Sequence, residues 1–130
     1  MTTLTPSPHD TIRRFADLLA EGDLDALVDL YEPEAAFSPR PGEAVSGREA
    51  IREALGPFLA LEPRMTGEIE RVLLAGDTAL VANRWTLTGT QPDGTPIELG
   101  GVSADVMRRR GDGSWGIAID DPWGGSQAAG

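Results

Sequence analysis

Apolar residues recur at helical spacing in three stretches of the first half of the chain. The first stretch, SPHDTIRRFADLLAEG, offers Ser7 as an N-cap, Pro8 at the first helical position and Gly22 just past the end. The second stretch begins at Asp23 and stops before Pro33. The third begins at SGRE, in which the serine and the glutamate have the spacing of a capping box. The pattern therefore predicts three N-terminal helices.

The apolar period changes to that of strands in the second half of the chain. Strands are predicted over residues 64–75, 78–90, 97–110 and 114–121, with GD, QPDGTP and GDG as the intervening turns, and a short strand over 35–38. Three helices followed by antiparallel strands predict an α+β domain with the helices on one face of the sheet.

A chain of 130 residues has room for one domain. We expect that domain to span residues 8–123, with a disordered N-terminus over residues 1–7 and a disordered tail over residues 124–130. The N-terminal segment lacks an apolar signal region, and no apolar run approaches the roughly 18 residues of a membrane span. We therefore expect a soluble, cytoplasmic protein.

Charge and residue types exclude several functional classes. The net charge of −10 argues against nucleic acid and membrane surfaces as partners. The chain has no cysteine, and its single histidine, His9, lies near the N-terminus, which argues against thiol chemistry, zinc sites and histidine-centred triads. The sequence also has no phosphate-binding loop, calcium hand or redox-cofactor motif. We expect no cofactor and no metal.

Three strings, AEGDLDALVDLYEPEAAF, SGREAIREAL and DVMRRRGDGSWGI, resemble the nuclear-transport-factor-2-like superfamily, and within it the SnoaL-like and ketosteroid-isomerase-like proteins. The resemblance covers roughly residues 8–123. It implies a cone-shaped, curved antiparallel sheet wrapped around the three helices, with a blind apolar pocket between them. It also implies a homodimer formed through the outer face of the sheet.

The same resemblance implies that the steroid-isomerase machinery is incomplete. Phe15 stands where that family has a tyrosine, and Pro39 stands where it has the catalytic base. Only the late-strand aspartate is matched, by Asp105. The related epoxide hydrolases have an arginine two positions before this aspartate, where this chain has Ser103. The SnoaL-like members, whose activities vary, are the nearest in overall pattern.

Asp105 stands inside a predicted strand, where aspartate is uncommon and costly to bury. If Asp112 and Gly113 form a two-residue turn, counting outward from it places Asp105 directly opposite Asp120. Opposed residues have Cβ atoms about 5 Å apart. Enclosed at that distance, the two carboxyls cannot both ionise, and one proton shared between them makes a general acid/base unit.

Two alternatives stay open at this point. The other face of the last hairpin, which is predicted to carry Val106, Trp115, Ile117 and Ile119, is more apolar, so both acids could instead face solvent. A three-residue turn that includes Gly111 would shift the register by one residue and separate the pair.

Further candidates for ligand contact are mostly aromatic, and each has a plain structural interpretation as well. Asn83 and Trp85 share one face of a predicted strand, which suits a ligand site or simply the core. Tyr31 lies on the apolar stripe of the second predicted helix and either presents its hydroxyl to the pocket or leaves it in water. Trp123 either covers the open end of the cone over a ligand or caps it structurally. We expect apolar walls around the acids from Phe15, Phe37, Trp85 and Met107.

These features predict a SnoaL-like protein that binds a small, apolar organic molecule. If it is an enzyme, the expected reactions are cofactor-independent isomerisation, cyclisation, dehydration or epoxide hydrolysis. Asp105 would then be the proton donor and Asp120 its carboxylate partner. The alternative is a non-catalytic ligand carrier or a dimerisation module of the same fold.

Overall fold

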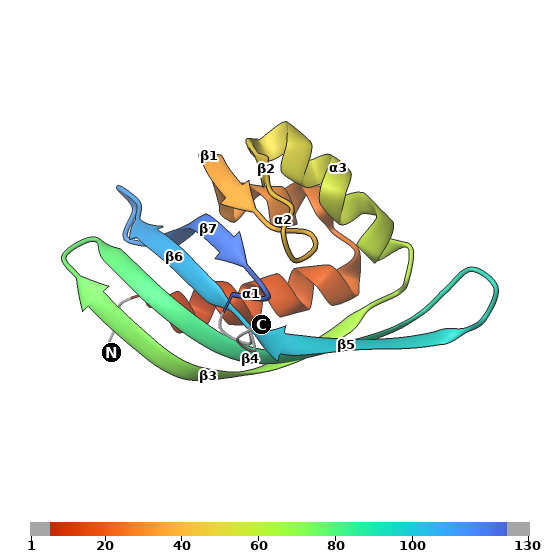
Figure 1. The fold of residues 1–130 in the computed structure, drawn as a ribbon. Helices are drawn as coiled ribbons and strands as arrows, with labels where there is room; N and C mark the ends of the chain where they lie inside the picture. The colour runs from red at the N-terminus through yellow and green to blue at the C-terminus, as the bar shows by residue number, and fades with distance from the viewer. Residues whose placement is uncertain (1–5, 125–130) are drawn as a thin grey trace, which may run out of the picture.

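The computed structural model describes residues 6–124 and contains three helices packed against one strongly curved sheet (Figure 1). The α+β architecture predicted from the sequence is confirmed. Two helices, two strands and a third helix follow one another in the first half of the chain, with bounds α1 (Pro8–Glu21), α2 (Leu24–Asp29), β1 (Tyr31–Phe37), β2 (Val45–Ser46) and α3 (Arg48–Leu59).

The remaining chain is β-structure, with bounds β3 (Arg64–Ala75), β4 (Thr78–Thr90), β5 (Pro96–Val102), β6 (Ala104–Arg109) and β7 (Trp115–Asp121). The strand order is β2-β1-β7-β6-β4-β3, and β5 pairs with β4 beyond the end of β6. All pairs are antiparallel except β1 with β7, which is parallel. The sheet is therefore mixed, whereas the sequence pattern predicted antiparallel strands only.

Helix α1 begins and ends as its sequence predicts. The backbone N–H of Ser7 donates to the Asp10 carboxylate at 2.8 Å, which is half of a capping box, and Gly22 closes the helix at φ 75°. The prediction of a capping box at the start of the third helix is wrong. Ser46 is paired with Ala36 in the short strand β2, so Gly47 takes the N-cap position without a side-chain bond.

Tyr31 opens β1 and does not end the second helix, which stops at Asp29. Pro33, predicted to stop the second helix, instead lies within β1. The β1–β7 ladder is irregular between Tyr31 and Ala36, so the missing N–H of Pro33 falls where strand pairing is interrupted. The short strand predicted over 35–38 is the end of this longer element.

The strand predicted over 97–110 is divided at Ser103 into β5 and β6, which both pair with β4. At the break, the backbone N–H of Asn83 donates to Ser103 Oγ at 3.2 Å, while the Ser103 N–H donates to the Asn83 carbonyl at 2.9 Å. The serine side chain therefore replaces a backbone acceptor in the ladder. It is buried on the inner side of the sheet.

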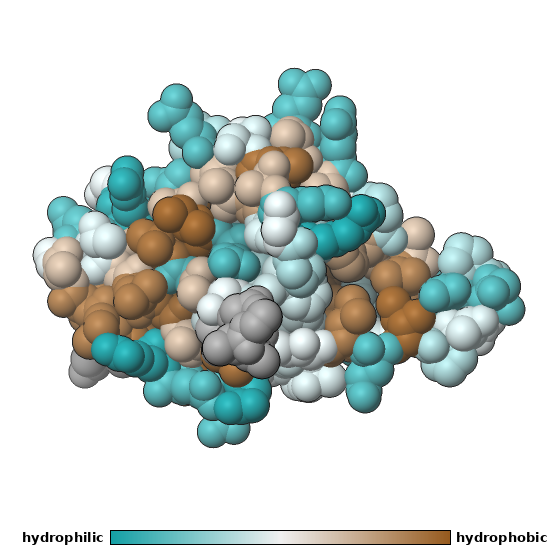
Figure 2. Space-filling model, in the orientation of Figure 1, coloured by the Kyte–Doolittle hydropathy of each residue, from teal (hydrophilic) through white to brown (hydrophobic). Residues whose placement is uncertain are grey.

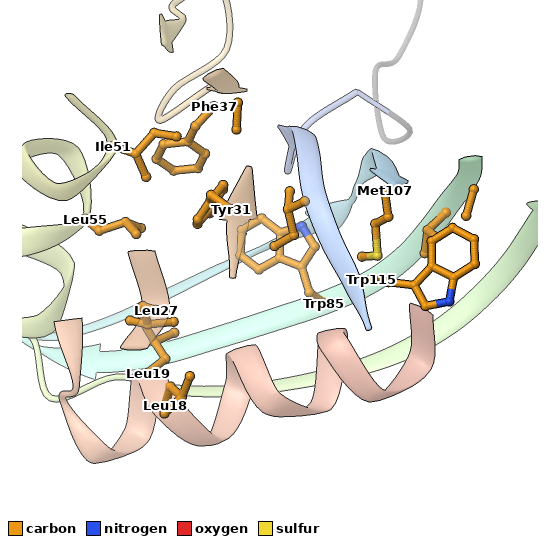
Figure 3. Close-up of a cluster of buried hydrophobic side chains, with 14 of the residues drawn as sticks. Leu18, Leu19, Leu27, Tyr31, Phe37, Ile51, Leu55, Trp85, Met107 and Trp115 are labelled. Atoms are coloured by element: carbon orange, nitrogen blue, oxygen red, sulfur yellow. The ribbon is translucent and has the colours of Figure 1, made fainter. Parts of the chain in front are cut away.

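The hydrophobic core fills the space between the concave face of the sheet and the helices (Figure 3). Its fully buried side chains come from every layer and include Leu18, Leu27, Tyr31, Ile51 and Met107. Because helices and sheet are joined through this one cluster, the elements that carry the site form a single packed body.

The outer face of the sheet has apolar side chains at its surface, seen as brown areas over the β3–β4 and β6–β7 regions in Figure 2. Leu73, Leu80, Val106 and Ile119 are register partners in turn across β3, β4, β6 and β7. Leu73, Leu80 and Ile119 are exposed, at 48%, 44% and 46%.

The terminal segments expected to be disordered fall mainly on residues 1–5 and 125–130, which lie outside the described residues. Within residues 6–124, no helix is both long enough and apolar enough to span a bilayer.

Candidate functional site

A cavity of about 90 Å³ lies between α1, α3 and the concave face of the sheet. Its walls are almost entirely apolar, and its polar groups are confined to Asn83, Ser103, Asp105 and Asp120. The principal apolar side chains of the wall are Phe15, Leu19, Phe37, Leu55, Trp85 and Ile117. The cavity therefore has one polar end in an otherwise apolar enclosure.

Asp105 on β6 and Asp120 on β7 are direct partners across the two antiparallel strands, and both line the cavity. The predicted pairing of the two acids is seen in the structure. Their carboxyl groups hydrogen-bond to each other. Asp105 is only 5% exposed, so the alternative in which it faces solvent does not hold.

Each acid has further hydrogen-bond donors. The Tyr31 hydroxyl donates to Asp120 Oδ2 at 2.6 Å, and the Ser103 hydroxyl donates to Asp105 Oδ2 at 2.8 Å. The backbone N–H of Asp121 donates to Asp105 Oδ1 at 3.2 Å. The two carboxyls are thus held from both sides by groups of the protein, which fixes their orientation toward the cavity.

Burial raises the pKa of Asp105 well above its ordinary value, and the neighbouring Asp120 charge raises it further. Burial also raises the pKa of Asp120, but the hydrogen bonds from Asp105 and Tyr31 oppose that rise. Hydrogen bonds from Ser103 and the Asp121 N–H oppose the rise at Asp105 as well, but its pKa is raised further than that of Asp120, so the proton of the pair resides on Asp105. Holding one proton, the pair is one acid and one carboxylate joined by a hydrogen bond.

The Tyr31 hydroxyl is unavailable as an acid in this site. Burial raises the pKa of Tyr31 well above its ordinary value, and the Asp120 charge adds to the effect. Its ring is fully buried and makes edge contacts with Phe15 and Phe37, at centroid distances of 6.3 and 6.2 Å. Tyr31 does not line the cavity and therefore serves as a fixed hydrogen-bond donor to Asp120.

The pairing of the acids results from two irregularities in the last hairpin. Arg110 N–H donates to the Ser114 carbonyl at 2.7 Å, so the turn contains three residues and pairs Arg109 with Trp115. A register shift then occurs between Val106 and Met107, with Ala118 as the extra residue. The bulge cancels the one-residue offset of the turn and returns Asp105 to its position opposite Asp120.

The C-terminal end of β7 closes one side of the cavity. Trp85 Nε1 donates to the Pro122 carbonyl at 2.8 Å, and Trp123 packs edge-on against Trp85 with centroids 5.3 Å apart. Trp123 Nε1 donates to the Ser38 carbonyl at 3.2 Å. These contacts hold the Pro122–Trp123 segment over the cavity between β4 and the end of β1.

The structure places five of the seven predicted ligand-contacting residues at the cavity: Phe15, Phe37, Asn83, Trp85 and Trp123. The other two do not line it. Tyr31 lies behind the acid pair because its strand position directs the hydroxyl to Asp120, and Met107 is wholly buried in the core. Pro39, at the position where the related isomerases have their base, also lines the cavity.

Sequence reasoning missed the role of Ser103. It noted the residue only as the absence of an arginine, whereas the structure shows a buried hydroxyl bonded to Asp105. The spacing of Ser103 and Asp105 could have indicated this contact, because residues two apart on a strand lie on the same face. No arginine or lysine lines the cavity, and the described residues contain no group of three acidic, histidine or cysteine side chains able to hold a metal ion.

Solved structures of similar fold are numerous. The chain superimposes with a TM-score of 0.77 on a nuclear transport factor 2-like superfamily protein from Salmonella enterica, at 18% identity over 92% of this chain and 89% of that one. A ketosteroid isomerase-like protein from Erwinia carotovora gives a TM-score of 0.73 at 20% identity, covering 86% and 88%. At these identities the likeness shows the fold alone.

A third similar structure, from Catenulispora acidiphila, was solved in complex with S-DNPA; it has a TM-score of 0.69 and 22% identity, with 86% of each chain covered. A comparison with curated proteins gives no match. The model of the SnoaL-like domain matches residues 12–115. That match spans most of the chain, from the first helix to the start of the last strand, so the chain belongs to the SnoaL-like domain family.

Proposed function

We propose that this SnoaL-like protein is an enzyme that moves protons on a small, neutral and largely apolar carbonyl compound, using its own acid pair. The observation that carries the proposal is the pairing of Asp105 and Asp120 at the polar end of an apolar cavity. Two carboxyls whose environment divides them into one acid and one base are a recurrent arrangement for general acid/base catalysis.

The two acids would have different tasks in an enolisation step. Asp120, as the carboxylate, takes a proton from the carbon beside the carbonyl, and the electrons of that C–H bond form the C=C bond. The carbonyl oxygen, which gains the displaced electron pair, takes the proton of Asp105. The hydrogen bond between the two acids then allows the proton to return from Asp120 to Asp105, which restores the starting state.

The ligand is proposed to be neutral because of the charges around the cavity. With one proton on Asp105 and Asp120 ionised, the acid pair carries one negative charge, and the cavity wall has no cation to offset the charge of an anionic substrate. A carboxylate or phosphate ligand would therefore be repelled and left unpaired in an apolar enclosure. The apolar walls favour a hydrocarbon body.

The proposal can be tested without knowledge of the natural substrate. Cyclohexanone in D₂O exchanges its α-protons when a base enolises it, and proton NMR measures the rate. We expect the protein to accelerate this exchange and expect Asp105→Asn and Asp120→Asn each to reduce the acceleration by about 100-fold. Circular dichroism of both variants serves as the folding control. Exchange that is equally fast in both variants and the original protein would disprove the proposal.

A second candidate function, a non-catalytic ligand carrier, is favoured by Phe15 and Pro39, which line the cavity at the positions where the related isomerases have a donor and a base. A carrier would bind ring compounds as tightly after Asp120→Asn as before, and it would not accelerate exchange. Ligand titration of this variant beside the exchange assay therefore separates the two functions.

We also propose that two copies of the chain associate through the outer face of the sheet. The row of Leu73, Leu80, Val106 and Ile119 supports this, because three of these four side chains are exposed and they adjoin across four strands. Contiguous exposed apolar surface of this kind favours association. Sedimentation equilibrium should give twice the chain mass of 13.8 kDa and, for Leu80→Lys with Ile119→Lys, the single chain mass. A monomeric original protein would refute the proposal.

A further inference from the structure

The side-chain oxygen of Asn83 is a buried polar atom for which residues 6–124 provide no hydrogen-bond donor. Asn83 lies on the inward face of β4 between Val81 and Trp85, is only 6% exposed, and lines the cavity. Its amide oxygen Oδ1 is buried, and none of the described residues donates a hydrogen bond to it. Buried polar side chains are nearly always satisfied, so an unsatisfied one at a cavity wall indicates a group that arrives with a ligand.

The surroundings of Asn83 keep space for its amide. On the neighbouring strand β3, Gly67 lies so close that a Cβ there would stand 2.8 Å from Asn83 Oδ1 and 3.0 Å from Nδ2. The backbone of Gly67 is not in the left-handed region, so close approach and not conformation requires the glycine here. Any larger residue at position 67 would push the amide from its place.

The amide and the acid pair line the same cavity. Val81 is the register partner of Asp105, and Asn83 lies two residues further along β4 on the same face. Such diagonal neighbours have Cβ atoms roughly 7–8 Å apart or less. Between them lies Ser103, which accepts from the Asn83 backbone N–H and donates to Asp105. A molecule the size of one ring can therefore reach both groups.

We infer that the ligand is a hydroxylated ring compound, in which one oxygen accepts the proton of Asp105 and a hydroxyl a few atoms away donates to Asn83 Oδ1. A hydroxyl supplies the missing donor without bringing a charge into the apolar cavity. An ammonium donor would have to be desolvated among these apolar walls. This inference rests on the proposed function, since it assumes that Asp105 meets a ligand oxygen in the same cavity.

The test compares 4-hydroxycyclohexanone with 4-methoxycyclohexanone, which keeps the ring and the carbonyl but lacks the donor. NMR titration gives the ratio of their dissociation constants. We expect the protein to prefer the hydroxyl compound by about tenfold and expect Asn83→Leu to reduce that preference to about one. Met65→Leu, a change of similar size on the same cavity wall, should keep the tenfold preference.

Two measurements keep the inference falsifiable if Asn83→Leu is altered in folding. Gly67→Ala leaves Asn83 in the chain but displaces its amide, and it should also reduce the preference. Thermal unfolding without ligand gives the second readout. Removing an unsatisfied buried amide should raise the midpoint by about 3–5 °C, whereas a lower midpoint would mean that Asn83 serves the fold and would overturn the inference.

The remaining outcomes separate this inference from the proposed function. If the hydroxyl preference is absent, or survives Asn83→Leu, while Asp105→Asn still abolishes exchange of cyclohexanone, only the role of Asn83 is wrong. If exchange does not depend on Asp105 but the hydroxyl preference depends on Asn83, the cavity binds such a ligand without the proposed chemistry. If neither ring compound binds at millimolar concentration, the inference is wrong, and the exchange of cyclohexanone decides the proposed function separately.

Discussion

Replacing Asp105 by asparagine should change how the stability of the protein depends on pH. The substitution keeps the size of the side chain and its ability to donate to Asp120, but it removes the proton that the pair holds. In the folded protein, burial and the adjacent Asp120 raise the pKa of Asp105 well above 3.8. In the unfolded chain, Asp105 is solvated and titrates near that ordinary value.

The sign of the effect follows from the number of bound protons. Between the unfolded-state pKa near 3.8 and the higher folded-state pKa, the folded protein holds a proton that the unfolded chain has lost. Unfolding therefore releases a proton, and the free energy of unfolding falls as the pH rises through this window. One excess proton corresponds to about 1.4 kcal/mol for each pH unit.

Asp105→Asn removes this proton, so the difference in free energy of unfolding between variant and original protein should grow by about 1.4 kcal/mol per pH unit above pH 4. It should become constant above the folded-state pKa. Changes in hydrogen bonds to Ser103 or Asp121 add an offset that does not depend on pH, so the slope is the diagnostic quantity. Urea unfolding at half-unit steps from pH 4 to 8 measures it.

Asp112→Asn is the matched control, because hydrogen bonds from Ser114 lower the pKa of this exposed turn aspartate. Its contribution has the opposite sign: it is present above the unfolded-state pKa and is lost as the pH falls through the folded-state value. This variant should therefore parallel the original protein above pH 5. A constant difference between Asp105→Asn and the original protein across the whole range would show that Asp105 holds no excess proton, and the reasoning would fail.

Three further substitutions test the surroundings of the acid pair. Tyr31→Phe removes the 2.6 Å bond to Asp120 and should cost about 1.5–3 kcal/mol in urea unfolding at pH 7, with a higher Asp120 pKa by carbon-13 NMR; an unchanged carboxyl titration would contradict the hydrogen bond. Ser103→Ala leaves the Asn83 N–H without its side-chain acceptor and should lower the free energy of unfolding by about 1–3 kcal/mol. Ser103→Thr keeps the hydroxyl and should retain most of that free energy. Trp123→Ala removes the edge contact with Trp85 and the bond to Ser38, and it should cost about 1–3 kcal/mol while speeding ring-compound binding in stopped-flow fluorescence; slower binding would mean that Trp123 does not restrict entry.

Counting residues outward from the turn predicts correctly that Asp105 pairs with Asp120. The register that produces this pair in the structure is nevertheless different from the one that was assumed. The count assumed a two-residue turn with unbroken pairing. The protein has a three-residue turn and a bulge at Ala118, and these two offsets cancel. The same bulge places Ile117 against the cavity and Ile119 on the outer face, whereas unbroken alternation would put both on one side.

The helices were predicted better than the strand boundaries, because caps are encoded by residues next to one another. Ser7, Pro8 and Gly22 specify the ends of α1 locally. The position of Tyr31 and the break at Ser103 depend on partners distant in the chain, Asp120 and Asn83. A pattern read along one strand does not contain those partners, so the hydroxyls that hold the acid pair could not be assigned from it.

The buried acid pair is not expected to increase the stability of the folded protein. Each carboxyl is desolvated, and the raised pKa of both groups means that their environment opposes ionisation. Replacing buried ionisable pairs by apolar residues of similar volume is often neutral or stabilising. Asp105→Leu combined with Asp120→Leu should therefore unfold at a higher urea concentration than the original protein at pH 7, while losing all acceleration of cyclohexanone exchange. A double variant that is less stable, or that fails to fold while Asp105→Asn folds normally, would show that the pair is needed for the structure itself. In that event its position at the cavity would carry no argument for catalysis.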